Sequence, residues 1–241
     1  MMKKLAFILL SAAMVLTLAA CTGTGQQAPA LPSSPSSQAG SSSTPGAEDG
    51  TSQSGGAATG GNILIAYFSV PETDGVDTVA GASRVVVDGE VLGNNQYLAQ
   101  LIQQETGGDL FRIETVQEYP GSHDALLNFA YNERSDDARP ELATQIQNPD
   151  NYDVIFLGYP NWNSDLPMPL YTFLEEYDFS GKTIIPFTAH GGSGFSRTIR
   201  TIQELQPNAT VIDDGLSISR NRVADAQDDV ISWISGLNIA P

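Results

Sequence analysis

Three short segments carry residues suited to holding an anion and a flat ring, and each follows an apolar run. Ser69 follows residues 62–68, and Gly93-Asn94-Asn95 opens a helical pattern after 23 intervening residues. A hydroxyl, a glycine and the amides of a helix start can together bind phosphate, because the helix dipole favours negative charge there. An Asn amide can donate to the same phosphate.

The other two segments offer a ring platform and accessible backbone groups. The second comprises Pro160, Asn161, Trp162 and Asn163, and the indole of Trp162 is a suitable platform for a flat ring. The third comprises Thr188, Ala189, His190, Gly191, Gly192 and Ser193. Its glycines would let backbone N–H and C=O groups approach a ligand closely. Taken singly, the three patterns are also typical of a helix start, a core tryptophan and an ordinary turn.

The elements that position these segments alternate between apolar runs and amphipathic stretches. Strands are expected at 62–68, 109–114, 153–158, 183–187 and 210–212. Near-continuous apolar runs indicate strands covered on both faces of a parallel sheet. Helices are expected around 98–106, 170–177, 199–205 and 223–237, the first ending at Gly107-Gly108. This alternation predicts a doubly wound α/β sheet, which binds ligands at the carboxyl ends of its strands.

The stretch between Ser69 and Gly93 contains one further pattern. Residues 85–91 read VVVDGEV, which predicts a β-hairpin with Asp88-Gly89 at its turn. The hairpin could be a lid, a partner surface or simply a decorated loop, and loops of this kind are mostly the last.

Composition excludes several functional classes. The 241 residues include 11 basic and 28 acidic side chains, a net charge of −17, which excludes nucleic acid as an expected partner. One Cys and two His are too few for a structural zinc site or an iron–sulfur cluster, so no metal is expected. With 41% hydrophobic residues, the chain has enough apolar surface for a core.

The N-terminus predicts export and anchoring. Two lysines precede an apolar run of 16 residues, which is shorter than the roughly 20 that span a membrane, so residues 1–20 are expected to be a signal peptide. Leu18-Ala19-Ala20-Cys21 resembles the lipobox of bacterial lipoproteins, which implies an acylated Cys21 at the outer face of the cytoplasmic membrane. A plain secretory signal with an incidental Cys is the alternative. Residues 21–61 are rich in Gly, Ser and Pro and predict a disordered tether, with one folded domain over 62–241.

Two longer phrases resemble the flavodoxins, especially extracytoplasmic flavodoxin-like lipoproteins. They are YDVIFLGYPNW at 152–162 and TFLEEYDFSGKTIIPFTAHGGSGF at 172–195. The resemblance implies a three-layer flavodoxin-like fold with a five-stranded parallel sheet in order 2-1-3-4-5, and FMN as the cofactor. It also implies roles for the three segments: phosphate binding by Ser69, Gly93, Asn94 and Asn95, ribityl and ring contacts by 160–163 with Trp162 stacked on the flavin, and ring-edge contacts by 188–193.

The phosphate segment departs from the family pattern. Flavodoxins have a compact loop such as S-x-T-G-N-T, whereas here residues 70–92 separate Ser69 from Gly93, Leu92 stands at the middle hydroxyl position and Asn95 at the last. The inserted carboxylates would repel a phosphate unless they point away from it. They are Glu72, Asp74, Asp77, Asp88 and Glu90.

The expected function is that of a membrane-tethered, extracytoplasmic electron carrier of low potential, because acidic surroundings without a nearby lysine disfavour full reduction of the flavin. His190 would either favour the reduced flavin when protonated or be a neutral, hydrogen-bonded loop residue. His123 is expected at the surface, in the loop after the second strand. The partner would be an unidentified redox protein or membrane electron donor, and the protein itself a monomer.

Two other functions fit the same residues. One is an FMN-dependent NAD(P)H:quinone-type oxidoreductase, which the same fold supports. The other is a flavin-free binding or scaffold protein, since fold does not fix function.

Overall fold

The computed structural model describes residues 62–73, 83–237 and 239. All of them lie in the second of the two units into which the chain divides, Ser54–Pro241. The predicted signal peptide, Cys21 and the tether lie outside the described residues, as do Asp74 and Asp77 of the insertion. None of the helices in the described part is long and apolar enough to cross a membrane.

Six strands build a parallel central sheet. They are β1 Ile63–Tyr67, β4 Asp109–Arg112, β5 Val154–Pro160, β6 Thr183–His190, β7 Thr210–Val211 and β8 Leu216–Ser219. The order is β4-β1-β5-β6-β7, and β8 also pairs with β6. The predicted order 2-1-3-4-5 is therefore confirmed, with β7 and β8 in the place of a single fifth strand.

The interruption of the fifth strand has a local cause in β6. Strand β7 pairs with Thr183 and Ile184, whereas β8 pairs from Phe187 onward. The gap lies opposite Pro186, which has no N–H to donate to a ladder. Gly215 passes here so closely that a Cβ would lie 2.3 Å from the Pro186 carbonyl oxygen. The sequence prediction missed β8, whose four residues LSIS are too few for a clear alternating pattern.

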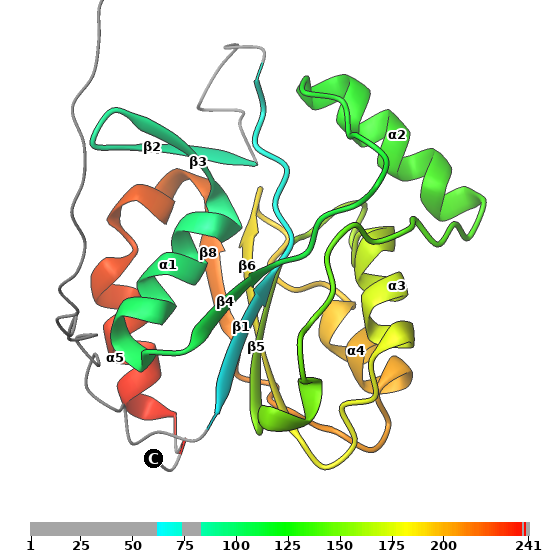
Figure 1. Ribbon diagram of the computed structural model, residues 1–241. Coiled ribbons are helices and arrows are strands. Elements are labelled where there is room, and N and C mark those ends of the chain that lie inside the picture. The colour runs from blue at the N-terminus through cyan, green and yellow to red at the C-terminus, as the bar shows by residue number, and fades with distance from the viewer. Residues whose placement is uncertain (1–61, 74–82, 238, 240–241) are drawn as a thin grey trace, which may run out of the picture. The chain divides into compact units, whose positions relative to one another are not determined.

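Helices cover both faces of the sheet (Figure 1). Helices α1 (Asn94–Thr106) and α5 (Gln227–Gly236) lie on one face, and α3 (Met168–Glu176) and α4 (Thr198–Leu205) on the other. Side chains of β1 alternate between the two cores, with Leu64 and Ala66 in one and Ile65 and Tyr67 in the other. This two-sided burial explains the near-continuous apolar run.

Two helical regions differ from the sequence prediction. Helix α2 (His123–Ser135) was not expected, because only Leu126, Ala130 and Glu133 of its 13 residues are buried and its apolar pattern is weak. The predicted helix 223–237 is divided into the 3-10 helix η2 (Arg220–Asp225) and α5. A second 3-10 turn, η1, spans Pro149–Asn151.

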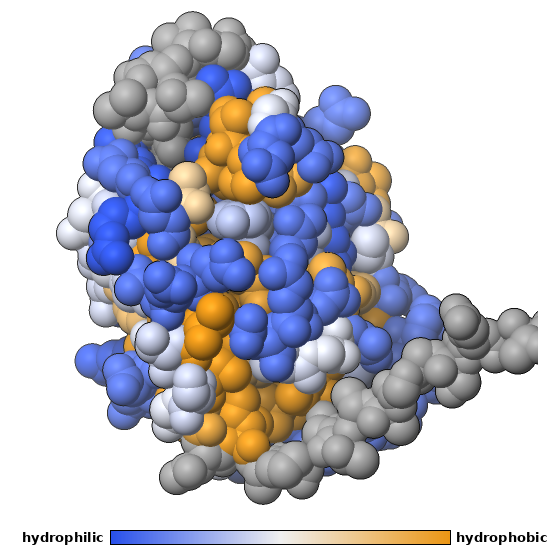
Figure 2. Space-filling view, turned by 90° about the vertical axis from the view of Figure 1, so that its left-hand side faces the viewer, coloured by the Kyte–Doolittle hydropathy of each residue, from blue (hydrophilic) through white to orange (hydrophobic). Residues whose placement is uncertain are grey.

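The predicted hairpin is confirmed. Strands β2 (Arg84–Val87) and β3 (Glu90–Gly93) pair antiparallel, and the turn residues Asp88 and Gly89 have φ values of 51° and 83°. Two positive φ values are typical of a type I′ turn. Val85 and Leu92 face the core, whereas the cross-strand pair Val86 and Val91 is about half exposed. The side of the molecule that carries the hairpin is mostly hydrophilic, with separate apolar areas (Figure 2).

Candidate ligand-binding site

Ser69 and Gly93 lie against each other although 23 residues separate them. A Cβ at Gly93 would be 2.1 Å from the Ser69 hydroxyl oxygen. The hairpin makes this approach possible, because its second strand ends at Gly93 and α1 begins at the next residue. The insertion therefore leaves the main sheet at Ser69 and returns to the same point.

The first two residues of α1 are buried, and each forms a hydrogen bond to another segment. The Asn94 N–H donates to the Ser83 carbonyl at 2.8 Å. The Asn95 Oδ1 accepts the Ala189 N–H at 3.0 Å, which ties the start of α1 to the end of β6. The two Asn residues are at most 1% exposed. The predicted phosphate segment and the predicted ring-edge segment are thus adjacent, and Asn95 links them.

Trp162 lies in the core. Its side chain is 5% exposed, and its ring centroid lies 5.5 Å from that of Phe68 and 5.6 Å from that of Tyr119. Pro160 ends β5, and Asn163 follows Trp162 in a tight turn. This is the arrangement of a core tryptophan, and stacking of Trp162 on a ligand stays a prediction.

Asn161 connects the second segment to the residues that directly follow the third. Its Nδ2 donates to the Gly194 carbonyl at 2.7 Å and lies 3.1 Å from the Ser196 hydroxyl. Its Oδ1 is buried and has no hydrogen-bond partner within the described residues. A buried amide oxygen without a partner is costly, so a ligand that donates a hydrogen bond here would be favoured.

The third segment favours the neutral form of His190. The Nδ1 of His190 accepts the Gly192 N–H at 2.9 Å, and burial lowers the pKa of the imidazole below its ordinary value of 6.5. Of the two roles predicted for His190, the structure agrees with the neutral, hydrogen-bonded one. Gly192 and Gly194 have φ values of 130° and 56°, a conformation that favours glycine. Thr188 is buried and donates to the Tyr159 carbonyl, whereas the Ser193 carbonyl accepts the Ser196 hydroxyl.

A basic residue that the sequence analysis missed lies beside this segment. A Cβ at Gly191 would lie 3.6 Å from Nη1 of Arg220 in η2. Arg220 is 29 residues away in the sequence, and only the pairing of β8 with β6 brings it to the glycines. The predicted ring-edge segment therefore has a cation, Arg220, beside it.

A cleft of about 410 Å³ opens at the carboxyl ends of β1 and β4. Ser69, Phe68 and Tyr119 contribute to its walls. The strand order reverses between β1 and β5, which is where doubly wound sheets usually bind ligands, so the cleft lies one strand to the side of that point.

A buried carboxylate lies behind the Tyr119 wall of the cleft. The Tyr119 hydroxyl lies 2.9 Å from both oxygens of Glu133, which also accepts from Gln117. Burial raises the pKa of Glu133, although the bonds from Tyr119 and Gln117 lower it. Burial and the neighbouring Glu133 also raise the pKa of Tyr119, which therefore stays protonated and donates.

The Glu72 carboxylate of the insertion is paired with His123. Glu72 is 2% exposed, and its Oε1 lies 2.8 Å from Nδ1 of His123. The prediction that His123 lies in a loop is wrong, because it is the first residue of α2. Its side chain is 34% exposed, so it lies at the surface in part, with Nδ1 on the buried Glu72 carboxylate. Asp88 and Glu90 are exposed at the hairpin.

The described residues contain no group of His, Cys, Asp and Glu side chains that could hold a metal ion.

The sheet is parallel and in this order, the predicted phosphate segment follows β1, and the two segments predicted to contact a ring follow β5 and β6. This combination defines a doubly wound α/β protein of the nucleotide- and flavin-binding class.

Comparison with known proteins identifies the family. The model of a family described as flavodoxin matches residues 84–237, so the chain belongs to the flavodoxin family. No curated protein matches the chain significantly.

Solved structures share the fold. A candidate flavoprotein from Bacteroides uniformis is 24% identical, with a TM-score of 0.52 over 73% of this chain and 99% of that one. A flavoprotein from Lactobacillus acidophilus, solved in complex with FMN, is 18% identical, with a TM-score of 0.48 over 69% of this chain and 98% of that one.

Proposed function

We propose that this flavodoxin binds FMN and carries electrons at the outer face of the bacterial cytoplasmic membrane. The observation that carries the proposal is the meeting of Ser69, Gly93 and the α1 N-terminus at the carboxyl end of β1, next to the end of β6. Membership of the flavodoxin family supports FMN as the ligand of this site.

The residues at the site fit a phosphate-bearing flavin. Gly93 has no Cβ, and this lets the Ser69 hydroxyl lie directly against the start of α1. No hydrogen bond to that hydroxyl is found in the described part of the chain, and the helix dipole favours an anion there. The buried Asn161 Oδ1 could accept a hydrogen bond from the flavin or its ribityl chain.

FMN, when bound, supplies the one- and two-electron redox chemistry. The protein would bind and orient it: Ser69 and the α1 N-terminus would hold the phosphate, 160–163 would face the ribityl chain and ring, and 188–193 would line the ring edge. His190, kept neutral by the Gly192 N–H, would add no charge to that edge. The net charge of −17 favours a low potential, and Arg220 opposes it locally.

The lipobox-like residues 18–21 support anchoring through a lipidated Cys21, and the Gly-, Ser- and Pro-rich residues 22–61 support a flexible tether. Such a tether would let the domain move between a membrane electron donor and a second redox protein. Radiolabelled palmitate incorporated by the wild-type chain but not by Cys21→Ser would support the anchor, and equal labelling would contradict it.

One observation favours the flavin-free alternative. The Ser83 carbonyl accepts the Asn94 N–H at the α1 N-terminus, where a phosphate oxygen would otherwise be held. FMN binding must displace this carbonyl or use the neighbouring amides, so the affinity for FMN is the quantity that decides between the two functions.

Steady-state kinetics separates a carrier from a reductase. FMN-loaded protein should oxidise NADH or NADPH no faster than the same amount of free FMN, yet pass electrons rapidly to cytochrome c after chemical reduction. Saturable NADH oxidation in the presence of a quinone would replace the carrier with the oxidoreductase.

A further inference from the structure

Asp165 is a buried acid in the turn that carries Trp162. Its side chain is 2% exposed. Trp162 and Asp165 exchange two backbone hydrogen bonds of 3.1 and 3.0 Å, and the residues between them, Asn163 and Ser164, both have positive φ values of 52° and 63°. Non-glycine residues adopt this conformation at a cost, so the turn needs support from its surroundings.

Five donors converge on the Asp165 carboxylate. Oδ1 accepts the Leu166 N–H and the Thr201 hydroxyl, each at 3.0 Å. Oδ2 accepts the Tyr171 hydroxyl at 3.0 Å and lies 3.1 Å from Arg197 Nε and 3.4 Å from Arg134 Nη2. The carboxylate thus joins the turn to α2, α3 and α4 at once.

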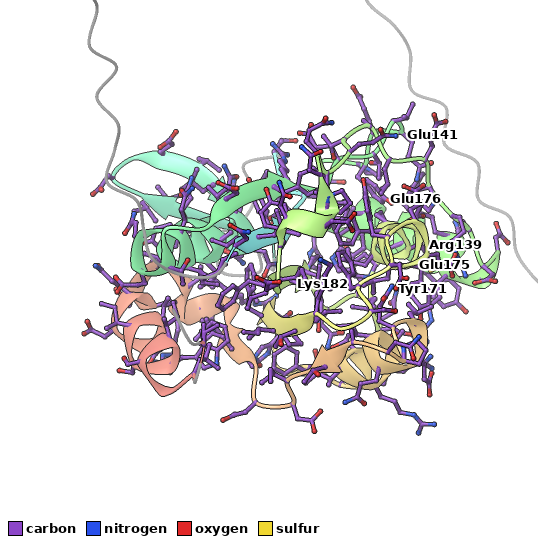
Figure 3. The ribbon with its side chains drawn as sticks, turned by 60° about the horizontal axis from the view of Figure 1, so that its bottom comes forward. Arg139, Glu141, Tyr171, Glu175, Glu176 and Lys182 are labelled. Carbon is purple, nitrogen blue, oxygen red and sulfur yellow. The ribbon has the colours of Figure 1, made fainter. Side chains whose placement is uncertain are left out.

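Two of these donors are themselves fixed. Arg134 also donates to the Asn163 carbonyl at 2.5 Å, so one guanidinium holds both the carboxylate and the backbone of the turn. The Tyr171 ring lies under the guanidinium of Arg139 at 5.2 Å, and Arg139 forms a two-pronged pair with Glu175 at 2.7 and 2.8 Å. Figure 3 shows Arg139, Tyr171 and Glu175 side by side.

Burial of the Asp165 carboxylate is energetically unfavourable for a loop that has only a structural role. Burying a carboxylate costs free energy that an apolar side chain would not, and the pairing with two arginines recovers that cost only when the geometry is good. Hydrogen bonds are directional, so each bond to the Asp165 carboxylate fixes the position of the turn relative to one helix. A loop that must be preorganised to bind a ligand requires its position to be fixed in this way.

We propose that Asp165 is a positioning residue for the ligand loop: it holds the 162–165 turn, and with it Trp162 and Asn161, in the geometry that receives the flavin ring. This inference rests on the proposed FMN function. We expect Asp165 to affect the ring and not the phosphate, because its carboxylate contacts the loop after β5 and, among the described residues, none of its partners belongs to the Ser69 segment.

The test compares FMN with riboflavin, which lacks the phosphate, in titrations followed by quenching of flavin fluorescence. Asp165→Asn should weaken the binding of both flavins by the same factor, about tenfold or more, since it removes a charge that accepts several hydrogen bonds. Ser69→Ala should weaken FMN but leave riboflavin unchanged. Glu204→Gln is the matched control: it removes the same charge from an exposed pair on α4 and should change neither constant.

A second readout needs no flavin. In a Trp233→Phe background, Trp162 is the only tryptophan, and at 5% exposure it should be poorly quenched by acrylamide. Asp165→Asn should increase that quenching, whereas Glu204→Gln should not. If Asp165→Asn fails to fold, Tyr171→Phe and Thr201→Val each remove a single donor and should weaken both flavins by about two- to tenfold.

Equal loss of FMN and riboflavin with increased quenching would establish the positioning role. Unchanged riboflavin binding in Asp165→Asn, or in both single-donor variants where that protein does not fold, would overturn it while leaving FMN binding intact. Failure of the wild-type protein to bind either flavin would overturn the proposed function and this role together.

Discussion

Replacing Gly93 by Ala tests whether the insertion really returns to its starting point. The backbone of Gly93 is extended, with φ −69° and ψ 143°, so alanine is not disfavoured by conformation. The penalty must come from Ser69, whose Oγ would lie 2.1 Å and whose Cβ would lie 3.0 Å from the new methyl group. Rotation of the hydroxyl relieves the first contact but not the second, so the expected loss is about 1–3 kcal/mol of unfolding free energy.

Urea denaturation of the purified protein, followed by far-UV circular dichroism, measures this loss in a double-mutant cycle. Ser69→Gly removes both opposing atoms, so Gly93→Ala should cost little in that background, with a coupling energy of at least about 1 kcal/mol. Gly236→Ala is the control, because no atom lies within 4 Å of its added Cβ, and it should be neutral or slightly stabilising. Additive effects of the two site substitutions would refute the placement of Ser69 beside Gly93.

Four shorter predictions follow from the same structure. Arg220→Gln should lower the midpoint potential of bound FMN measured by spectroelectrochemistry, because it removes a cation beside the glycine loop; an unchanged potential would place Arg220 outside the site. His190 should titrate by NMR with a pKa below 6.5. Because its pKa in the folded protein is lowered, the contribution of His190 to stability is present above pH 6.5 and is lost as the pH falls through the folded pKa. A titration midpoint above 6.5 would contradict the burial of the imidazole. The raised pKa of Glu133 gives the opposite sign: the wild-type protein should lose stability relative to Glu133→Gln as the pH rises from below 4.5 through the raised value, which urea denaturation at several pH values can check. Gly158→Ala should destabilise the fold by about 1–3 kcal/mol, because its Cβ would lie 2.1 Å from the Phe187 ring, and a melting temperature equal to that of the wild type would contradict this contact.

The sheet could be predicted from the sequence because its strands are buried on both faces. Residues 62–68 and 153–158 are apolar almost throughout, and a run of this kind and length is typical of a strand in the middle of a parallel sheet. The hairpin could also be predicted from the sequence, because Asp88 and Gly89 readily adopt the two positive φ values that its turn needs. Helix α2 and strand β8 were missed because neither has a strong period in its apolar residues.

The candidate site was predictable only in outline. Sequence order places its three segments after particular strands, and their meeting at one edge follows from the parallel sheet. The contacts that specify the site join residues distant in the chain: Ser83 with the α1 N-terminus, Glu72 with His123, and Asp165 with donors on three helices. A single sequence carries no signal for such pairs, because an acid in a loop reads as a solvated charge until the fold buries it.

For Trp162, the sequence predicted the position in the chain but not the contacts of the ring. Its position after β5 was predicted correctly, but the rings of Phe68 and Tyr119 that cover it come from the ends of other strands and loops.

The most direct test of the central claim is the visible absorbance of the purified protein before and after incubation with FMN and desalting. The proposed function predicts that flavin bands are retained in stoichiometric amount by the wild-type protein and by Glu204→Gln. Gly93→Ala, whose methyl group would push the Ser69 hydroxyl out of place, should lose them. A wild-type protein that is colourless after desalting would contradict FMN binding, and the flavin-free function would take its place.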